Sequence, residues 1–143
     1  MSDETSWERE DREQEEREKA IVRRIAEDLD AYAEGRAYSD EDGEEHIIPD
    51  LGEDVPEDWE PRGMRDYFED IYNIRYVVDG DLDYVGARVM VACGGPNIWV
   101  DTYNQTVDLY WGGDHVSYEL WSSTTDEIDE IFREQYETLR CGC

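Results

Sequence analysis

Residues 97–120 read NIWVDTYNQTVDLYWGGDHVSYEL, and this stretch decides the fold class. Apolar and polar side chains alternate along it, which is the period of a strand with one buried face. Two interruptions, at 103–105 and 112–114, are short enough for tight turns between antiparallel neighbours. The strands expected here are 97–102, 106–111 and 115–120.

Two more strands are expected upstream, at 74–78 and 83–92, because the same period continues on both sides of Asp79-Gly80-Asp81. A turn at residues 94–96, Gly-Gly-Pro, joins the second of them to the stretch above. Together these segments predict an antiparallel meander of four to five strands.

Helical patterns flank the strands on both sides. A short helix is expected before the sheet and a longer one after it, where residues 123–126 read STTD, typical of a helix N-terminus. The short helix is marked by Met64, Tyr67, Phe68 and Ile71. The stripe of the last helix is Ile128, Ile131, Phe132, Tyr136 and Leu139.

A long helix is expected over residues 5–34, since Thr5-Ser6-Trp7-Glu8 has capping-box spacing and no Pro or Gly follows before Gly35. Residues 8–19 contain no apolar side chain, so only the second half can dock on a core. Acid–base pairs one turn apart, such as Glu15 and Lys19, support the first half. The expected docking stripe is Ile21, Ile25, Leu29 and Tyr32, with Val22, Ala26 and Ala33 beside it.

Residues 37–61 are the most acidic part of the chain and contain no Lys or Arg. Three prolines and two glycines argue against a long helix, so we expect a loop or a partly ordered arm pinned by apolar side chains. The eleven acids are Asp40, Glu41, Asp42, Glu44, Glu45, Asp50, Glu53, Asp54, Glu57, Asp58 and Glu60. The candidate pins are Ile47, Ile48, Leu51, Val55 and Trp59.

The chain thus divides into a charged helix, 1–36, an acidic arm, 37–61, and a core domain, 62–143. The fold class expected is α+β: a long N-terminal helix, a short helix, an antiparallel four- to five-stranded meander and a C-terminal helix. Helices should cover one sheet face. The side chains expected on that face are Ile98, Val100, Val107, Leu109, Val116, Tyr118 and Leu120.

The other sheet face is expected to be open and chemically mixed. Aromatic rings among acids are typical of interaction surfaces, because a ring contributes buried area and acids select a cationic partner. A structural alternative stays open: Trp99 and Tyr110 form a cross-strand pair, or the long helix or the arm covers them. Alternation places Trp99, Asp101, Asp108, Tyr110, His115, Ser117 and Glu119 there.

Charge dominates the composition, with 40 Asp and Glu against 13 Lys and Arg among 143 residues and a formal net charge of −27. Such a chain repels nucleic acid and anionic membranes, so we expect neither as a direct ligand and expect basic partners. No apolar run suits a membrane span and no signal-like segment opens the chain, which predicts a cytoplasmic protein.

No metal site or cofactor is expected. Residues 79–83, DGDLD, open like an EF-hand loop, but the sixth and twelfth positions are Tyr and Met where the loop needs Gly and Glu. Zinc binding by Cys93 with the C-terminal Cys-Gly-Cys is disfavoured, because that pair lacks the usual spacing and no second pair exists. We expect Cys93 to be buried.

Catalysis is not expected either. Among forty carboxylates, pairs of acids carry no information about acid–base chemistry. His46 and His115 lie in no recognisable nucleophile motif.

The favoured hypothesis is a DNA mimic. Duplex DNA presents one negative charge per about 1.7 Å of axis, and folded carboxylates can occupy the same cationic groove. The acids of the arm and of the last helix would trace the phosphate path, with Trp99 and Tyr110 as anchors. The candidate partner-binding residues are Asp40, Glu41, Asp42, Glu44, Glu45, Glu53, Asp54, Glu57, Asp58, Trp99, Asp101, Asp108, Tyr110, Glu119, Asp126, Glu127, Asp129, Glu130 and Glu134.

In size, charge and the acid-rich runs Ser39–Glu45 and Glu53–Glu60, the chain resembles the small acidic DNA-mimic inhibitors, anti-restriction and anti-CRISPR, of phages and mobile genetic elements. The hairpin at 92–102 and the run 107–111 are also similar to small uncharacterised proteins of such elements, over about residues 90–137. The resemblance implies inhibition, by occlusion, of a nucleic-acid-binding protein or ribonucleoprotein of host defence, and carries over no catalytic residue.

Two other hypotheses remain open. A halophile-adapted domain of other function would also be acidic and poor in lysine, and Lys19 is the one lysine here. An acidic chaperone would also bind a basic protein, although disordered acidic tails usually serve that purpose. A homodimer through the open sheet face or the long helix also stays open.

Overall fold

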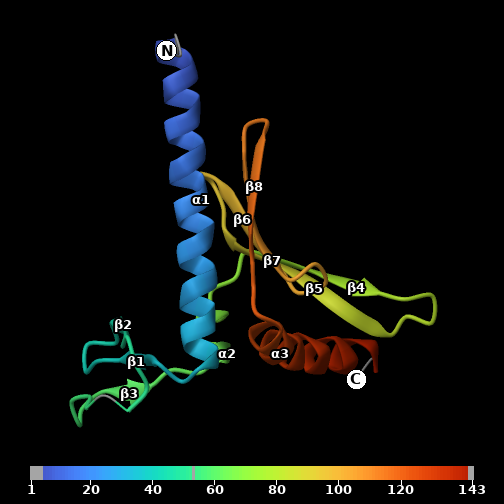
Figure 1. Ribbon diagram of the computed structural model, residues 1–143. Helices are drawn as coiled ribbons and strands as arrows, with labels where there is room; N and C mark the ends of the chain where they lie inside the picture. The colour runs from blue at the N-terminus through green and yellow to red at the C-terminus, as the bar shows by residue number, and fades with distance from the viewer. Residues whose placement is uncertain (1–4, 53, 142–143) are drawn as a thin grey trace.

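The computed structural model describes residues 5–52 and 54–141 and has the expected α+β architecture (Figure 1). Two long helices accompany a five-stranded antiparallel sheet, and a second, three-stranded sheet lies at one end of the molecule. The elements are α1 (Ser6–Ala33), β1 (Ala37–Ser39), β2 (Glu45–Ile47), β3 (Glu60–Pro61), α2 (Met64–Tyr67), β4 (Asn73–Val78), β5 (Tyr84–Ala92), β6 (Asn97–Asp101), β7 (Thr106–Trp111), β8 (Asp114–Glu119) and α3 (Ser122–Arg140).

The larger sheet is the predicted meander, with strand order β4-β5-β6-β7-β8 and antiparallel neighbours throughout. Each strand begins and ends within one residue of its expected bounds, because every turn carries a clear Gly, Asn or Asp signal. The register places Trp99 opposite Asp108, and Arg88 opposite Asp101.

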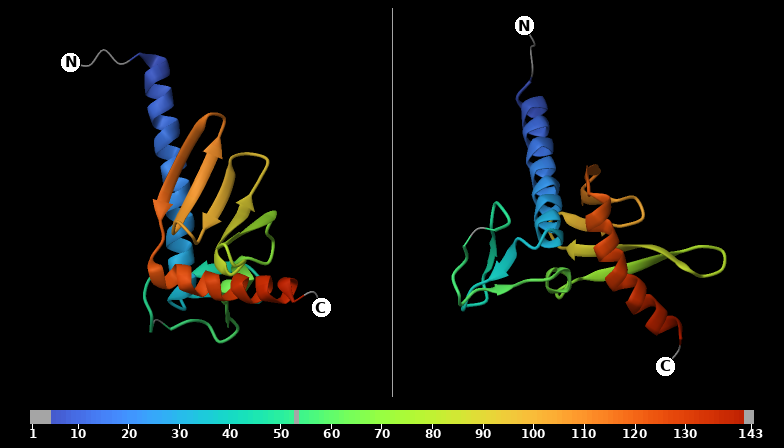
Figure 2. Two further views of the ribbon diagram at one scale, coloured as in Figure 1. Left: turned by 90° about the vertical axis from the view of Figure 1, so that its right-hand side faces the viewer. Right: turned by 60° about the horizontal axis from the view of Figure 1, so that its bottom comes forward.

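The hydrophobic core lies between one face of this sheet and the helices. α1 packs against β7 and β8, and α3 packs against β5, so both helices cover the same face (Figure 2). The expected inward side chains are buried, with the exception of Tyr118, which is exposed beside Lys19 and Arg23 of α1. The sheet contributes Ala87, Val89, Ile98, Val100, Val107, Leu109 and Val116 to this core.

Helix α1 begins as predicted, because the side chains of Thr5 and Glu8 accept each other's backbone amides, at 3.3 and 3.1 Å. The docking stripe is rotated relative to the prediction: Val22 and Ala26 are fully buried, whereas Ile21 is 40% exposed. Leu29 and Tyr32 of the predicted stripe are buried, so the prediction is confirmed in the last turns of the helix and is wrong at Ile21. The N-terminal part of α1 rises beyond the sheet (Figure 1).

Helix α3 starts at Ser122, with Trp121 as its N-cap, so the prediction of a cap within residues 123–126 was wrong. Both threonine hydroxyls are used elsewhere. Thr125 donates to the carbonyl of Trp121 at 3.0 Å, and Thr124 donates to Asp30 of α1.

The acidic arm contains a small sheet of strand order β2-β1-β3, which the sequence did not predict, while residues 48–52 and 54–59 form turns and loops as expected. Its strands have only two or three residues, too few to show a period of two. Ile48 is buried as expected, but Leu51 is 63% exposed. Trp59 stacks on His46 with ring centroids 4.2 Å apart.

No helix in the described ranges is both long enough and apolar enough to cross a bilayer.

Candidate partner-binding surfaces

The β1–β2 turn of the arm is held by Asp40. Its Oδ1 accepts the amides of Asp42 and Glu44, at 2.9 and 3.0 Å, and its Oδ2 lies 2.8 Å from Nε2 of His46. The bond to His46, followed by the backbone bonds, lowers the pKa of Asp40 below its usual range. This carboxylate is therefore ionised and engaged within the turn.

Glu45 binds the arm to the body of the protein. It accepts a hydrogen bond from the hydroxyl of Tyr32, and that hydroxyl also accepts one from Nε of Arg62 at 2.7 Å. Burial and the bond to Glu45 raise the pKa of Tyr32 to about 12, so the phenol stays protonated. Of the predicted binding acids, Asp40 and Glu45 thus have internal partners.

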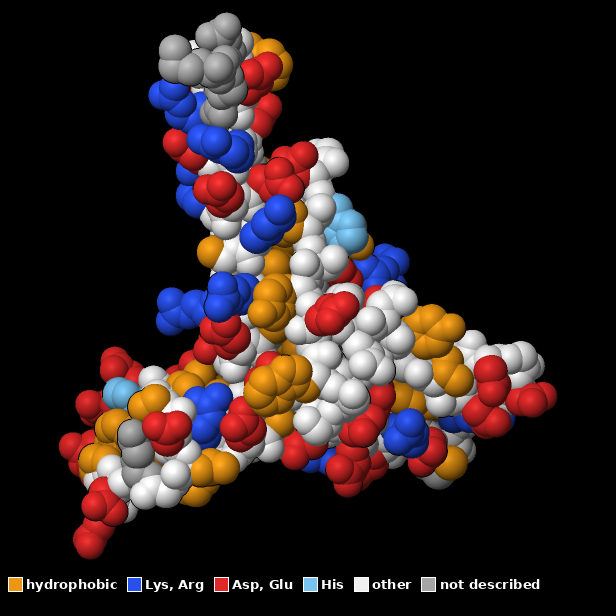
Figure 3. Space-filling model, in the orientation of Figure 1, with side chains coloured by type: hydrophobic (Ala, Val, Ile, Leu, Met, Phe, Trp, Pro, Cys, Tyr) orange, Lys and Arg blue, Asp and Glu red, His pale blue; other side chains and the backbone are white. Residues whose placement is uncertain are grey.

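The remaining described candidates in the arm are exposed: Glu41, Asp42, Glu44, Asp54, Glu57 and Asp58. Glu53 lies outside the described residues. The arginines that bracket the arm turn inward, because Arg36 donates to the carbonyl of Ile48 at 2.7 Å and Arg62 donates to Tyr32. Acidic side chains consequently gather over the arm, at the lower left of Figure 3.

The candidate acids of α3 fall into two groups. Asp129 accepts from the hydroxyl of Tyr84 at 2.7 Å, and Glu134 pairs with Arg65 of α2 at 2.7 Å. Asp126, Glu127 and Glu130 are exposed.

The open sheet face differs from expectation at Trp99, which is only 7% exposed. Among the described residues, the ring contacts of Trp99 are with two arginines of its own sheet. The guanidinium carbons of Arg75 and Arg88 lie 5.3 and 4.9 Å from the centroid of its ring, one from each of the two preceding strands. Trp99 is therefore clamped by cations of its own sheet.

The predicted acids on this face, Asp101 and Asp108, are buried as well. Asp101 lies 3.5 Å from Nε of Arg88 and accepts two hydrogen bonds from Asn104, each 2.9 Å long. Asp108 accepts from Thr106 at 3.1 Å and contacts Nε2 of His115 at 3.2 Å. These carboxylates are positioned by internal contacts, so little of them is available to a partner.

Tyr110 and Glu119 remain accessible on the same face. Tyr110 is 37% exposed and stacks on His115, with ring centroids 4.4 Å apart and planes 3° from parallel. Of the two predicted aromatic anchors, Tyr110 is the one that solvent reaches.

Residues 79–83, the EF-hand-like run, form the β4–β5 turn. Oδ1 of Asp79 accepts the amides of Asp81 and Asp83, at 2.9 and 3.0 Å, and Arg140 pairs with Asp83 at 2.9 Å. The acid that opens the run therefore organises the hairpin backbone. Cys93, in the β5–β6 turn, is exposed, so the expectation that it is buried was wrong.

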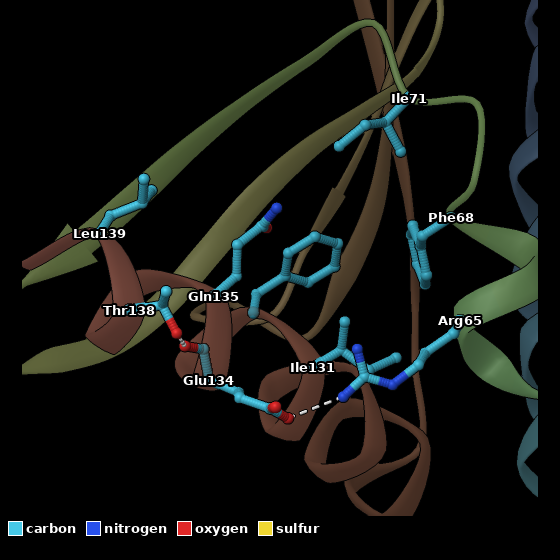
Figure 4. Close-up of a pocket in the computed structure, with 9 residues that line it drawn as sticks. Arg65, Phe68, Ile71, Ile131, Glu134, Gln135, Thr138 and Leu139 are labelled. Carbon is cyan, nitrogen blue, oxygen red and sulfur yellow. Dashed lines mark hydrogen bonds and ion pairs between the residues drawn. The ribbon is translucent and has the colours of Figure 1, made fainter. Parts of the chain in front are cut away.

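A groove of about 410 Å³ lies between α2 and α3 (Figure 4). Phe68, Ile71 and Phe132 give it an apolar lining, and the ion pair of Arg65 with Glu134 crosses one side. Its titratable side chains already neutralise each other, so the groove suits an apolar group and not acid–base chemistry.

Sequence reasoning missed the two arginines that lie against Trp99 and the burial of Glu18 on α1. The clamp had a signal: Arg75 and Arg88 share the period-two face of Trp99 once the hairpin registers are drawn. Comparison with protein-family models, curated proteins and solved structures finds no match for this chain.

Proposed function

We propose that this protein is a DNA-mimic inhibitor that occupies the basic nucleic-acid-binding groove of a host defence complex in the cytoplasm. One observation carries the proposal: the exposed carboxylates of the arm lie in the turn and loops that join the strands of a hydrogen-bonded sheet, with no Lys or Arg between residues 37 and 61. The proposal requires no cofactor, no catalytic group and no direct contact with nucleic acid.

Order in the arm supports this function, because a mimic must present its charges in fixed positions. Strand β1 pairs with both β2 and β3, the Asp40 turn closes one end, and Tyr32 joins Glu45 to the body. An ordered array loses less conformational entropy on binding than a disordered acidic tail. The sheet therefore favours a structured groove as target over generic attraction to basic chains.

The exposed acids of α3 supply a second negative surface. Asp126, Glu127 and Glu130 lie within about one helical turn of one another, where Cβ atoms are separated by about 5–6 Å. This spacing is comparable to that of phosphates along a strand. DNA-binding proteins gain affinity by exchanging condensed counterions for Lys and Arg, and such carboxylates can engage the same cations.

The test is competition for a partner. The protein, immobilised at low salt, should capture from host lysate a protein that binds nucleic acid. The captured protein should elute at about 0.5 M salt, because screening weakens the contacts. Added duplex DNA or guide-like RNA should displace the captured protein. A captured partner without any nucleic-acid-binding groove would overturn the proposal.

Variants of the arm sharpen this test. Neutralising Glu41, Asp42 and Glu44 to Gln, Asn and Gln removes three exposed charges, while Asp40 still holds the turn and Glu45 still accepts from Tyr32. The matched control neutralises three exposed acids of α1, Glu10, Glu13 and Glu16, to Gln. The affinity of the arm variant for the captured partner should fall at least tenfold, and that of the control much less.

A further inference from the structure

A pocket of about 500 Å³ lies between the first half of α1 and the β7–β8 hairpin. Figures 1 and 2 show this hairpin running beside α1. One wall is a single face of the helix and the other is the start of β8. The lining residues are Glu8, Asp11, Arg12, Glu15, Glu18, Asp114, His115 and Val116.

The pocket is strongly negative, since five carboxylates face one guanidinium and one imidazole. Two of those carboxylates are already engaged: Glu8 accepts the amide of Thr5 at 3.1 Å, and Glu15 pairs with Lys19 at 3.2 Å. Glu15 is neutralised by Lys19, and the other four acids, Glu8, Asp11, Glu18 and Asp114, outnumber the guanidinium of Arg12 and keep the described pocket negative.

Glu18 distinguishes this pocket from the other acidic surfaces. It is 6% exposed, although it lies on the otherwise exposed half of α1. Its Oε1 accepts a 3.1 Å hydrogen bond from Nε2 of Gln14, while its Oε2 is buried and has no hydrogen-bond partner in the described chain. A buried carboxylate oxygen without a donor is costly, so the fold leaves an acceptor at this pocket that a ligand's donor can satisfy.

We propose that this pocket receives the guanidinium group of an arginine side chain from the partner, an inference that rests on the proposed function. A guanidinium presents paired N–H donors that match a carboxylate, and its aliphatic stem can lie along Val116. A compact metal ion fits less well, because the carboxylates of this pocket are not among the described groups whose ligand atoms converge on one point.

The test uses a tri-arginine peptide as the probe and the full-length protein at low salt, with affinity measured by calorimetry. Glu18→Gln keeps the shape of the side chain and the contact with Gln14, and should weaken binding about tenfold by removing one charge-assisted pair. The matched control, Glu13→Gln, removes the same charge from an exposed position of α1 and should change affinity less than twofold. A tri-citrulline peptide, which has the same shape without the charge, should not bind.

Equal weakening in the two variants would overturn the proposal, because binding would then reflect only net charge. Unfolding in urea provides the check on integrity: Glu18→Gln should be at least as stable as the parent, since it removes an unpaired buried charge. Probe binding that depends on Glu18, without any nucleic-acid-binding partner, would retain this site and overturn the proposed function. If a nucleic-acid-binding partner were inhibited and neither that inhibition nor probe binding depended on Glu18, the proposed function would stand and this site would be overturned.

Discussion

The hydroxyl of Thr124 on α3 donates a 2.5 Å hydrogen bond to Oδ1 of Asp30 on α1, and both side chains are buried where the helices meet. Thr124→Val keeps the volume but removes this donor, so we expect a loss of about 1–3 kcal/mol in the free energy of unfolding. Ser123→Ala, at an exposed position on α3, should change stability by less than about 0.5 kcal/mol. Urea denaturation of both variants measures the difference.

Asp30 should also make stability depend on pH. Burial, opposed by the hydrogen bonds from Thr124 and the amide of Trp121, raises its pKa above the ordinary value of 3.8. The folded state therefore binds the proton more tightly, and this contribution to stability is present below pH 3.8 and lost as the pH rises through the raised pKa. Asp30→Asn should flatten that decline.

Exposed Asp126→Asn is the control for this experiment, because it removes the same charge without relieving burial. Urea unfolding at a series of pH values between about 3 and 7 gives the two profiles. If the profile of Asp30→Asn matched that of Asp126→Asn, general charge repulsion and not Asp30 would explain the pH dependence.

Trp99 and Tyr110 should respond differently to truncation, although both were expected to be anchors for a partner. Trp99→Ala removes a buried ring that Arg75 and Arg88 lie against and should cost about 3 kcal/mol of stability. Tyr110→Ala removes a half-exposed ring and should cost about 1 kcal/mol or less. Thermal unfolding of the two variants gives the comparison, and equal losses would contradict the clamp.

The order of the arm should depend on the hydroxyl of Tyr32. Tyr32→Phe removes the group that joins Glu45 to Arg62, so amides of the β1–β2 pair should exchange with deuterium faster. Tyr38→Phe is the control, because no hydrogen bond of its hydroxyl is found in the described part of the chain. Unchanged exchange in Tyr32→Phe would show that backbone pairing alone holds the arm.

The local elements could be predicted because their signals are local. The capping box at Thr5 and the turns between the strands are each written within a few residues, and α1 and the five-stranded meander appear where expected. The small sheet of the arm could not be predicted in the same way, since strands of two or three residues carry no period.

For the candidate surfaces, the sequence likewise predicted the face on which a residue lies but not whether its side chain is accessible. The sequence placed Trp99, Asp101 and Asp108 on the open face correctly, but their accessibility depended on arginines from neighbouring strands and on Asn104 and His115. Which acids bind internally and which face solvent is a matter of distances between residues far apart in the chain, as Glu45 with Tyr32 and Asp129 with Tyr84 show.

By itself, the sequence determined the net charge, the sheet with its alternating faces, the long capped helix and the acid-rich arm. These properties follow from composition and from the geometry of neighbouring residues. Only the tertiary structure decided that Val22, and not Ile21, faces the core, that Trp99 is covered, and that Glu18 is enclosed beside the hairpin. The reason is that burial depends on how closely separate elements approach, and the packing of the whole chain sets that distance.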